Sequence, residues 1–161
     1  TGISPQSFKP SAKGVGGYMN STLAKIDAVE NGYDDAIMLG DNDVVAEGSG
    51  QNLFLIKNGK IFTPPIETGA LGGITRKTVI EIASKLGLET EEININANQL
   101  KDADELFFTG TATEVVGVVS VDGEDISNGN PGQITGDIRK KYLEIVNGED
   151  ENFLHYLTLV K

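Results

Sequence analysis

The sequence predicts an α+β domain built from mostly antiparallel strands, and three observations lead to this prediction. Neighbouring apolar segments are mostly separated by short turns, which is how antiparallel strands are joined. Helical periodicity is confined to a few longer segments between them. The 161 residues, of which 39% are hydrophobic, fall in the range of one globular domain with a sizeable core. A doubly wound parallel sheet, with a helix after nearly every strand, does not fit this order.

The strands are predicted from short apolar segments that end at turn residues. The strongest signal is Asn58-Gly59, a two-residue hairpin turn between two apolar segments, the second of which ends at Pro64-Pro65. Asp122-Gly123 is a similar turn later in the chain. The predicted strands cover residues 36–39, 44–47, 52–57, 60–63, 93–95, 105–108 and 115–121.

Helices are predicted where apolar residues recur every three or four positions and a stop signal follows. In the first helix this spacing runs from Met19 to Val29, and Asn31-Gly32 supplies a left-handed C-terminal stop. Thr75 opens a second helix directly after a glycine-rich loop, and Gly148 stops the last one. The predicted helices cover residues 18–30, 75–86, 97–103 and 133–146.

Charge and composition exclude several classes of function. With 13 Lys and Arg against 24 Asp and Glu, the formal net charge of −11 repels nucleic acid and anionic membrane surfaces. The absence of cysteine and the single histidine exclude thiolate and multi-histidine sites, so no metal is expected. No apolar run approaches the roughly 20 residues of a membrane span, and no targeting signal is recognisable, so we expect a cytoplasmic protein.

Two loops are suited to binding a small anion. Gly72-Gly73-Ile74-Thr75 enters a predicted helix, whose first backbone N–H groups are unpaired and lie at the positive end of the helix dipole. Thr111-Ala112-Thr113-Glu114 fits the capping-box pattern directly after a buried strand. An ordinary N-capped surface helix also explains either loop, and neither loop identifies the anion.

Lys13 and Glu47 are candidate site residues because of their surroundings. Lys13 precedes three glycines within four residues, which allow close approach of the backbone, and Glu47 lies between an apolar strand and a glycine-rich loop. Taken alone, a lysine or a glutamate in such a position is more often a solvated surface residue.

Five segments of the chain occur in the order, and at the separations, that are found in a known family. They are Pro10-Ser11-Ala12-Lys13 followed by Tyr18, then Val45-Ala46-Glu47-Gly48-Ser49-Gly50-Gln51-Asn52-Leu53-Phe54, Thr63-Pro64-Pro65, Gly73-Ile74-Thr75-Arg76 and Ala103-Asp104-Glu105-Leu106-Phe107-Phe108-Thr109-Gly110-Thr111-Ala112. Each segment is weak evidence alone, but together they are specific. Over nearly its whole length the chain resembles the class IV aminotransferases, which include branched-chain amino acid aminotransferase.

The resemblance implies that the cofactor is pyridoxal 5′-phosphate and that Lys13 carries it as a Schiff base. Lys13 would also move the proton between the substrate α-carbon and the cofactor. Glu47 would pair with the pyridine nitrogen and keep it protonated, so that the ring accepts electrons. Tyr18 would donate a hydrogen bond to the phenolic oxygen of the ring.

The same resemblance assigns the two loops to the cofactor and the substrate. Ile74, Thr75 and Thr111 would hold the phosphate through backbone N–H groups and hydroxyls, which agrees with the anion site expected from the helix N-terminus. The backbone N–H groups of Thr111 and Ala112 would face the substrate carboxylate.

At the level of the whole protein, the resemblance implies the larger, cofactor-binding domain of a subunit, a pseudo-barrel of mostly antiparallel strands with flanking helices. Residues 1–161 would form this C-terminal domain, and a smaller N-terminal domain would be absent from this chain; residues 1–11 look like the interior of a longer chain. The implied reaction is amino transfer between leucine, isoleucine or valine and 2-oxoglutarate, with glutamate and 2-oxo acids as the other small-molecule partners. We expect a homo-oligomer, and an inactive chain in isolation.

Three alternatives remain open from the sequence. A D-amino acid aminotransferase and an aminodeoxychorismate lyase share the implied fold, although the segments at residues 48–52 and 110–114 look more like the branched-chain type. The third alternative is a non-catalytic domain that binds a small anion on its two loops.

Overall fold

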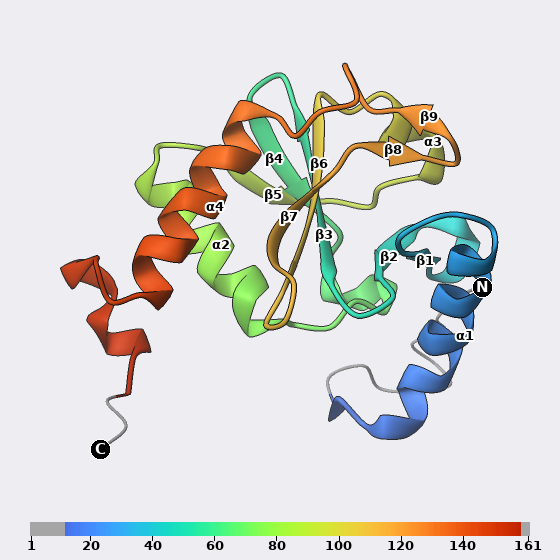
Figure 1. Cartoon of the computed structure of the whole chain (residues 1–161), viewed down its shortest axis with the longest axis horizontal. Helices are drawn as coiled ribbons and strands as arrows, with labels where there is room; N and C mark the ends of the chain where they lie inside the picture. Colours follow the sequence, from blue (N-terminus) through green and yellow to red (C-terminus); the bar gives the residue numbers. More distant parts are fainter. Residues whose placement is uncertain (1–11, 159–161) are drawn as a thin grey trace.

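The computed structural model describes residues 12–158, so Pro10, Ser11 and the rest of the segment 1–11 lie outside the described residues. A central sheet carries two helices, α2 and α4, on one face, while α1 lies with β1 and β2 at one end of the molecule (Figure 1). The predicted α+β class, with mostly antiparallel strands and flanking helices, is confirmed. Over residues 12–158, no helix is long and apolar enough to cross a membrane.

The central sheet has five strands in the order β5-β4-β3-β6-β7, and all neighbours are antiparallel except β4 and β5. The strands are β3 (Asn52–Lys57), β4 (Lys60–Thr63), β5 (Thr90–Glu92), β6 (Glu105–Gly110) and β7 (Glu114–Val118). The hairpin between β3 and β4 turns at Asn58 and Gly59, whose φ values of 52° and 74° are those of the expected two-residue turn. The paired strands β3 and β6 are buried on both faces, so they form the centre of the core.

One face of this sheet is covered by α2 (Ile74–Lys85) and α4 (Gln133–Val146). Phe54 of β3 and Phe107 of β6 are fully buried there, and their rings stack at a centroid distance of 4.9 Å. Glu105, at the start of β6, accepts hydrogen bonds from the backbone N–H groups of Ile134 (3.0 Å) and Thr135 (2.8 Å), and thereby caps the first turn of α4. Both helices are thus attached to the sheet by apolar packing, and α4 also by a partly buried cap.

The other face packs against smaller elements. They are α3 (Ala97–Lys101), the pair β8 (Ser120–Val121) and β9 (Glu124–Asp125), and the pair β1 (Ile37–Leu39) and β2 (Val45–Gly48). Leu53 and Leu55 of β3, with Leu106 and Phe108 of β6, meet Val45 of β2 in this second cluster. Because β2 packs here and leads directly to β3, its last residues lie at the edge of the core.

The helix α1 (Tyr18–Glu30) has the predicted bounds, but its apolar residues do not face the core. Met19, Leu23 and Val29 are 70%, 59% and 55% exposed, whereas Ser21 and Ala24 are buried. The periodicity therefore predicted the helix correctly, while none of residues 12–158 covers its large apolar side chains.

Two predictions of local structure were wrong. The strand expected at residues 93–95 lies earlier, at β5, which pairs in parallel with β4. Ile95 is buried next to β2 without belonging to a named strand, and its carbonyl accepts a hydrogen bond from Val45 N (2.8 Å). The apolar alternation at Ile93 and Ile95 thus reflects burial and not strand pairing. The strand itself is the polar segment Thr90–Glu92.

The capping box expected at Thr111-Ala112-Thr113-Glu114 was also wrong, because no helix follows it. These residues turn between β6 and β7, and Gly110 pairs with Glu114 across the hairpin. The structure instead has a capping box at Asn96, where Gln99 accepts a hydrogen bond from Asn96 N at 2.8 Å. The loop at Thr111 therefore offers turn N–H groups and hydroxyls, not a helix N-terminus.

Candidate active site

A cavity of about 270 Å³ lies where the start of α1, the end of β2, the loop before α2 and the end of β6 meet. It is lined by six of the seven site residues expected from the sequence: Lys13, Tyr18, Glu47, Ile74, Thr75 and Thr111. Ala112 does not line it, and lies exposed in the adjoining turn. Residues separated by up to 98 positions in sequence thus converge on one space, although each was selected from a local segment.

Glu47 is a carboxylate in this cavity whose pKa departs from its ordinary value. Its Oε2 accepts a hydrogen bond from Leu71 N (2.8 Å) and a longer one from Asn52 Nδ2 (3.4 Å). Burial raises the pKa of Glu47 to about 7, and the hydrogen bond from Leu71 only partly opposes this effect. A carboxylate with such a pKa gains most from a cationic partner, and it is the kind of group that clusters at functional sites.

Asn52 joins this carboxylate to the loop before α2. Its Nδ2 donates to the carbonyl of Leu71 at 2.7 Å. A Cβ atom on Gly73 would lie 2.2 Å from Asn52 Oδ1, so only glycine allows the loop to approach this closely. Asn52 was part of a motif in the sequence, but nothing there indicated that it holds this loop.

The N-terminus of α2 faces the cavity without a side-chain cap. Gly73 is the N-cap residue and supplies no side chain, and Ile74 and Thr75 are the first two helical residues. Thr75 is buried, whereas the side chain of Ile74 is 75% exposed. This arrangement leaves backbone donors at the positive end of a helix dipole beside the cavity.

Thr109 is a lining residue that sequence reasoning missed. It is fully buried on β6, and its Oγ1 has no hydrogen-bond partner among the described residues. A buried hydroxyl without a partner is costly, so such a group needs an explanation. With Thr75 and Thr111, it is one of three threonines in the cavity wall.

Lys13 lies on the open side of the cavity, just before the first turn that leads into α1. Its φ of 45° is in the left-handed region, which costs a non-glycine residue about 1–2 kcal/mol. Gly17 N donates to Gly14 O at 3.0 Å and closes the turn that follows. Backbone strain of this kind is typical of functional sites, and here it falls on a lysine that lines the cavity.

The remaining wall comes from the loop between β2 and β3. Ser49, Gly50 and Gln51 all line the cavity. Sequence reasoning found this loop only as part of a motif and assigned none of these three residues to the site. The loop connects Glu47 directly to Asn52, so its conformation sets the positions of both.

Comparison with known proteins finds aminotransferases as relatives of this chain. The sequence model of the family described as amino-transferase class IV matches residues 2–121. The chain is 46% identical over 149 residues to the probable branched-chain-amino-acid aminotransferase of Aquifex aeolicus and 44% identical over 150 residues to the branched-chain-amino-acid aminotransferase of Pseudomonas aeruginosa. These alignments cover 92% and 93% of this chain and 48% of each relative, so the chain spans about half the length of the curated relatives it matches.

A solved structure agrees closely with this fold. Branched-chain amino acid aminotransferase from Thermobaculum terrenum, in its PLP-bound holo form, superposes with a TM-score of 0.94 at 40% identity. The match covers 98% of this chain and 52% of that one. With the family model matching most of its length and the fold shared in detail, the chain belongs to the class IV aminotransferase family.

Proposed function

We propose that this chain is the cofactor-binding part of a branched-chain amino acid aminotransferase that uses pyridoxal 5′-phosphate attached to Lys13. The reaction is amino transfer between leucine, isoleucine or valine and 2-oxoglutarate. The observation that carries the proposal is the convergence of the family-matched residues on one cavity, with a strained lysine and a buried carboxylate in the same wall. The names of the relatives supply the substrate class.

The cavity fits the phosphate of this cofactor. The uncapped N-terminus of α2 presents backbone N–H groups, and Ile74 and Thr75 occupy its first turn. The unpartnered hydroxyl of Thr109 lies in the same wall, as does Thr111. An anion placed here pairs with the helix dipole and satisfies the buried hydroxyl, even though the overall charge of the chain opposes it.

The cavity also fits the ring. When bound, pyridoxal phosphate supplies a ring that accepts electrons and an aldehyde carbon that reacts with amines. Glu47 places a carboxylate of raised pKa in the wall, where a protonated ring nitrogen would favour its ionised form. Tyr18, at the start of α1, also lines the cavity, and its phenol is suited to the ring oxygen.

Lys13 would supply the amine that anchors the cofactor. Its Nζ would also hold the proton that moves between the substrate α-carbon and the cofactor. We place the substrate carboxylate beside the turn after β6, where Thr111 lines the cavity and Ala112 lies exposed, facing their backbone N–H groups. Closure of the open side of the cavity would remove water from these groups.

We further propose that a second, N-terminal domain closes this open side and forms much of the substrate pocket, and that the subunits form a homo-oligomer. The relatives are about twice as long as the aligned region, and the large apolar residues of α1 stay exposed within the described part of the chain. Without that domain the substrate is neither desolvated nor oriented, so we expect the chain alone to be inactive.

The experiment is an amino-donor panel on two proteins, the chain alone and the chain fused after the N-terminal half of the Aquifex aeolicus relative. Leucine, isoleucine, valine, D-alanine and aminodeoxychorismate are offered, with 2-oxoglutarate as acceptor for the amino acids. The proposal expects transfer from the three branched-chain L-amino acids by the fusion and negligible turnover by the chain alone. A preference for D-alanine or for aminodeoxychorismate would contradict the substrate class. Rapid turnover by the chain alone would contradict the need for a second domain.

A further inference from the structure

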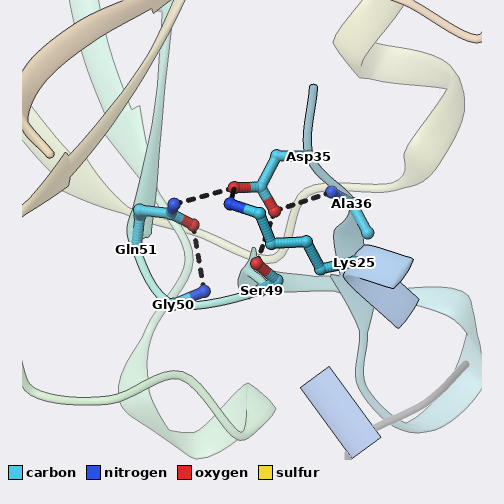
Figure 2. Close-up of polar contacts among 6 residues, drawn as sticks. All are labelled: Lys25, Asp35, Ala36, Ser49, Gly50 and Gln51. Atoms are coloured by element: carbon cyan, nitrogen blue, oxygen red, sulfur yellow. Dashed lines mark hydrogen bonds and ion pairs between the residues drawn. The ribbon is translucent and has the colours of Figure 1, made fainter. Parts of the chain in front are cut away.

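Asp35, in the segment between α1 and β1, accepts hydrogen bonds from four donor groups (Figure 2). Its Oδ1 accepts from Ser49 Oγ and from Ala36 N (2.8 Å). Its Oδ2 accepts from Lys25 Nζ (3.0 Å) and Gln51 Nε2 (2.8 Å). One carboxylate therefore connects α1, its own backbone and the loop between β2 and β3.

This carboxylate is ionised and largely removed from water. Only 13% of the Asp35 side chain is exposed, against 48% for its ion-pair partner Lys25. Burial raises the pKa of Asp35, but the hydrogen bonds from Ser49, Ala36, Lys25 and Gln51 together lower it by more. The net pKa therefore lies below its usual value. Both oxygens have two donors each, which is the saturation expected of a buried charge that is well compensated.

The loop that Asp35 holds is a wall of the cavity. Ser49, Gly50 and Gln51 all line it, and Ser49 is buried despite its hydroxyl. Gln51 is held at its other end too, because its Oε1 accepts from Gly50 N at 2.9 Å. A Cβ atom on Gly48 would lie 2.7 Å from this Oε1, so the Gln51 side chain is packed against the loop's own backbone.

The 48–51 loop joins two polar residues that line the cavity. Glu47 precedes the loop and Asn52 follows it, and both form hydrogen bonds with the backbone of Leu71. Within the loop, Gly48 N donates to Gln51 O at 2.7 Å and Gly50 N donates to Gln51 Oε1. Asp35 is the acidic side chain outside the loop that holds two of its residues, from 14 and 16 positions away.

We propose that Asp35 is a positioning residue for the cavity, whose carboxylate fixes the 48–51 loop and so the relative placement of Glu47 and Asn52 for cofactor binding. The identity of the ligand rests on the function proposed above, whereas the claim that Asp35 orders the 48–51 loop does not. A neutral amide cannot accept all four of these hydrogen bonds. In one orientation of the Asp35→Asn amide, Nδ2 would face the donors Lys25 Nζ and Gln51 Nε2, and in the other it would face the donor Ala36 N.

The first test measures backbone hydrogen exchange on the cofactor-free chain, wild type against Asp35→Asn. The control is Asp34→Asn, which removes the same charge from the exposed neighbouring residue. We expect the amides of residues 48–52 to exchange at least about tenfold faster in Asp35→Asn only, with the β3 and β6 core unchanged. Equal protection in wild type and Asp35→Asn, or equal loosening in Asp34→Asn, would overturn the proposal.

The second test measures pyridoxal phosphate affinity by equilibrium dialysis at a temperature where all variants are fully folded by circular dichroism. We expect Asp35→Asn to bind at least about tenfold more weakly than wild type and Asp34→Asn to bind normally. A loosened loop with unchanged affinity would refute the positioning role. If wild type itself does not bind, the proposed function of the cavity fails, and hydrogen exchange alone decides whether Asp35 orders the loop.

A second pair of variants covers the case in which Asp35→Asn does not fold. Ser49→Ala and Gln51→Met each remove one donor to Asp35 and leave Asp35 in place, and Gln51→Met also removes the acceptor of Gly50 N. Each is expected to loosen residues 48–52 and weaken binding by less than Asp35→Asn would. Combining Ser49→Ala with Gln51→Met should loosen the loop further than either change alone. Wild-type exchange and affinity in this double variant would overturn the proposal.

Discussion

The carboxylate of Glu47 accepts a hydrogen bond from Leu71 N at 2.8 Å, and this contact joins the end of β2 to the loop that enters α2. The carboxylate proposed to face the ring nitrogen is therefore hydrogen-bonded directly to the loop that leads into the proposed phosphate site. Burial, which raises the pKa of Glu47 to about 7, is the cost of this placement.

Glu47→Gln should change how the stability of the cofactor-free chain depends on pH. Because the folded pKa is raised from 4.5 to about 7, the folded state disfavours the charged form, and stability present below pH 4.5 is lost as pH rises through 7. This loss reaches about 3 kcal/mol, and glutamine removes it while still accepting from Leu71 N. Urea unfolding at pH 5 and pH 8 should show the variant gaining stability relative to wild type at the higher pH.

The control for this measurement is Glu67→Gln, since Glu67 is exposed. That substitution should leave the pH dependence of wild type intact. The same pH dependence in wild type and Glu47→Gln would show that Glu47 is not held in a desolvated position. In the fused protein, Glu47→Gln should also lose most of the amino-transfer rate while retaining cofactor.

Thr109→Val should separate ligand binding from stability. The hydroxyl of Thr109 has no partner among the described residues, so the isosteric valine should leave the free energy of unfolding unchanged or raise it by about 1 kcal/mol. The affinity for inorganic phosphate and for pyridoxal phosphate should fall by about 1–2 kcal/mol, because a hydrogen bond to a charged group is lost.

Thr63→Val is the matched comparison, because the buried hydroxyl of Thr63 donates to Leu53 O at 2.8 Å. It should lower stability, as the removed donor leaves a carbonyl unpaired. If Thr109→Val lowered stability as much as Thr63→Val, or left phosphate affinity unchanged, the hydroxyl of Thr109 would not be a ligand group.

Gly73→Ala and Gly72→Ala should differ sharply although the residues are neighbours. A Cβ on Gly73 would lie 2.2 Å from Asn52 Oδ1, whereas one on Gly72 would find its nearest atom at 3.9 Å. Asn52 cannot turn away without losing its hydrogen bond to Leu71 O. We expect Gly73→Ala to cost about 1–3 kcal/mol in thermal or urea unfolding, and Gly72→Ala to be tolerated. Equal effects would contradict the close approach of the loop to Asn52.

The predictions that succeeded from sequence rest on local chemistry. The β3–β4 hairpin follows from Asn58 and Gly59, which adopt the left-handed backbone that their turn requires. The helix α4 has the predicted bounds because its periodicity and its stop at Gly148 are local signals. The expected site residues also depended on short motifs, and six of them line one cavity, while the roles assigned to them stay predictions.

The predictions that failed depend on contacts between distant segments. The strand β5 is stabilised by parallel pairing with β4 and by Lys60, which lies 2.7 Å from Glu91, and neither contact leaves a periodic pattern. Thr109 was not recognised as a site residue, nor was Asp35, because a threonine in a buried strand or an aspartate after a helix has no distinctive local signal. Only the folded chain places Asp35 against Ser49.

The exposed apolar face of α1 should make the isolated chain associate with itself. Met19 and Leu23 are 70% and 59% exposed, and such a face promotes association in water. Sedimentation should show a concentration-dependent increase in mass that is reduced by changing both residues to glutamine. Leu154→Gln, at a similarly exposed leucine far along the chain, should not reduce it. Equal effects would contradict a specific role for α1.

The most direct measurement is the mapping of pyridoxal phosphate on the chain after reduction with sodium borohydride. Lys13 is the lysine that lines the cavity, whereas Lys25 is held by Asp35 and Lys60 by Glu89 and Glu91. At limiting cofactor, peptide mass mapping should find the label on Lys13, and an excess of inorganic phosphate should reduce it by occupying the phosphate end of the cavity. Lys13→Ala should abolish the label. Label spread over the surface lysines, or persisting undiminished in Lys13→Ala, would contradict the assignment of this cavity as the cofactor site.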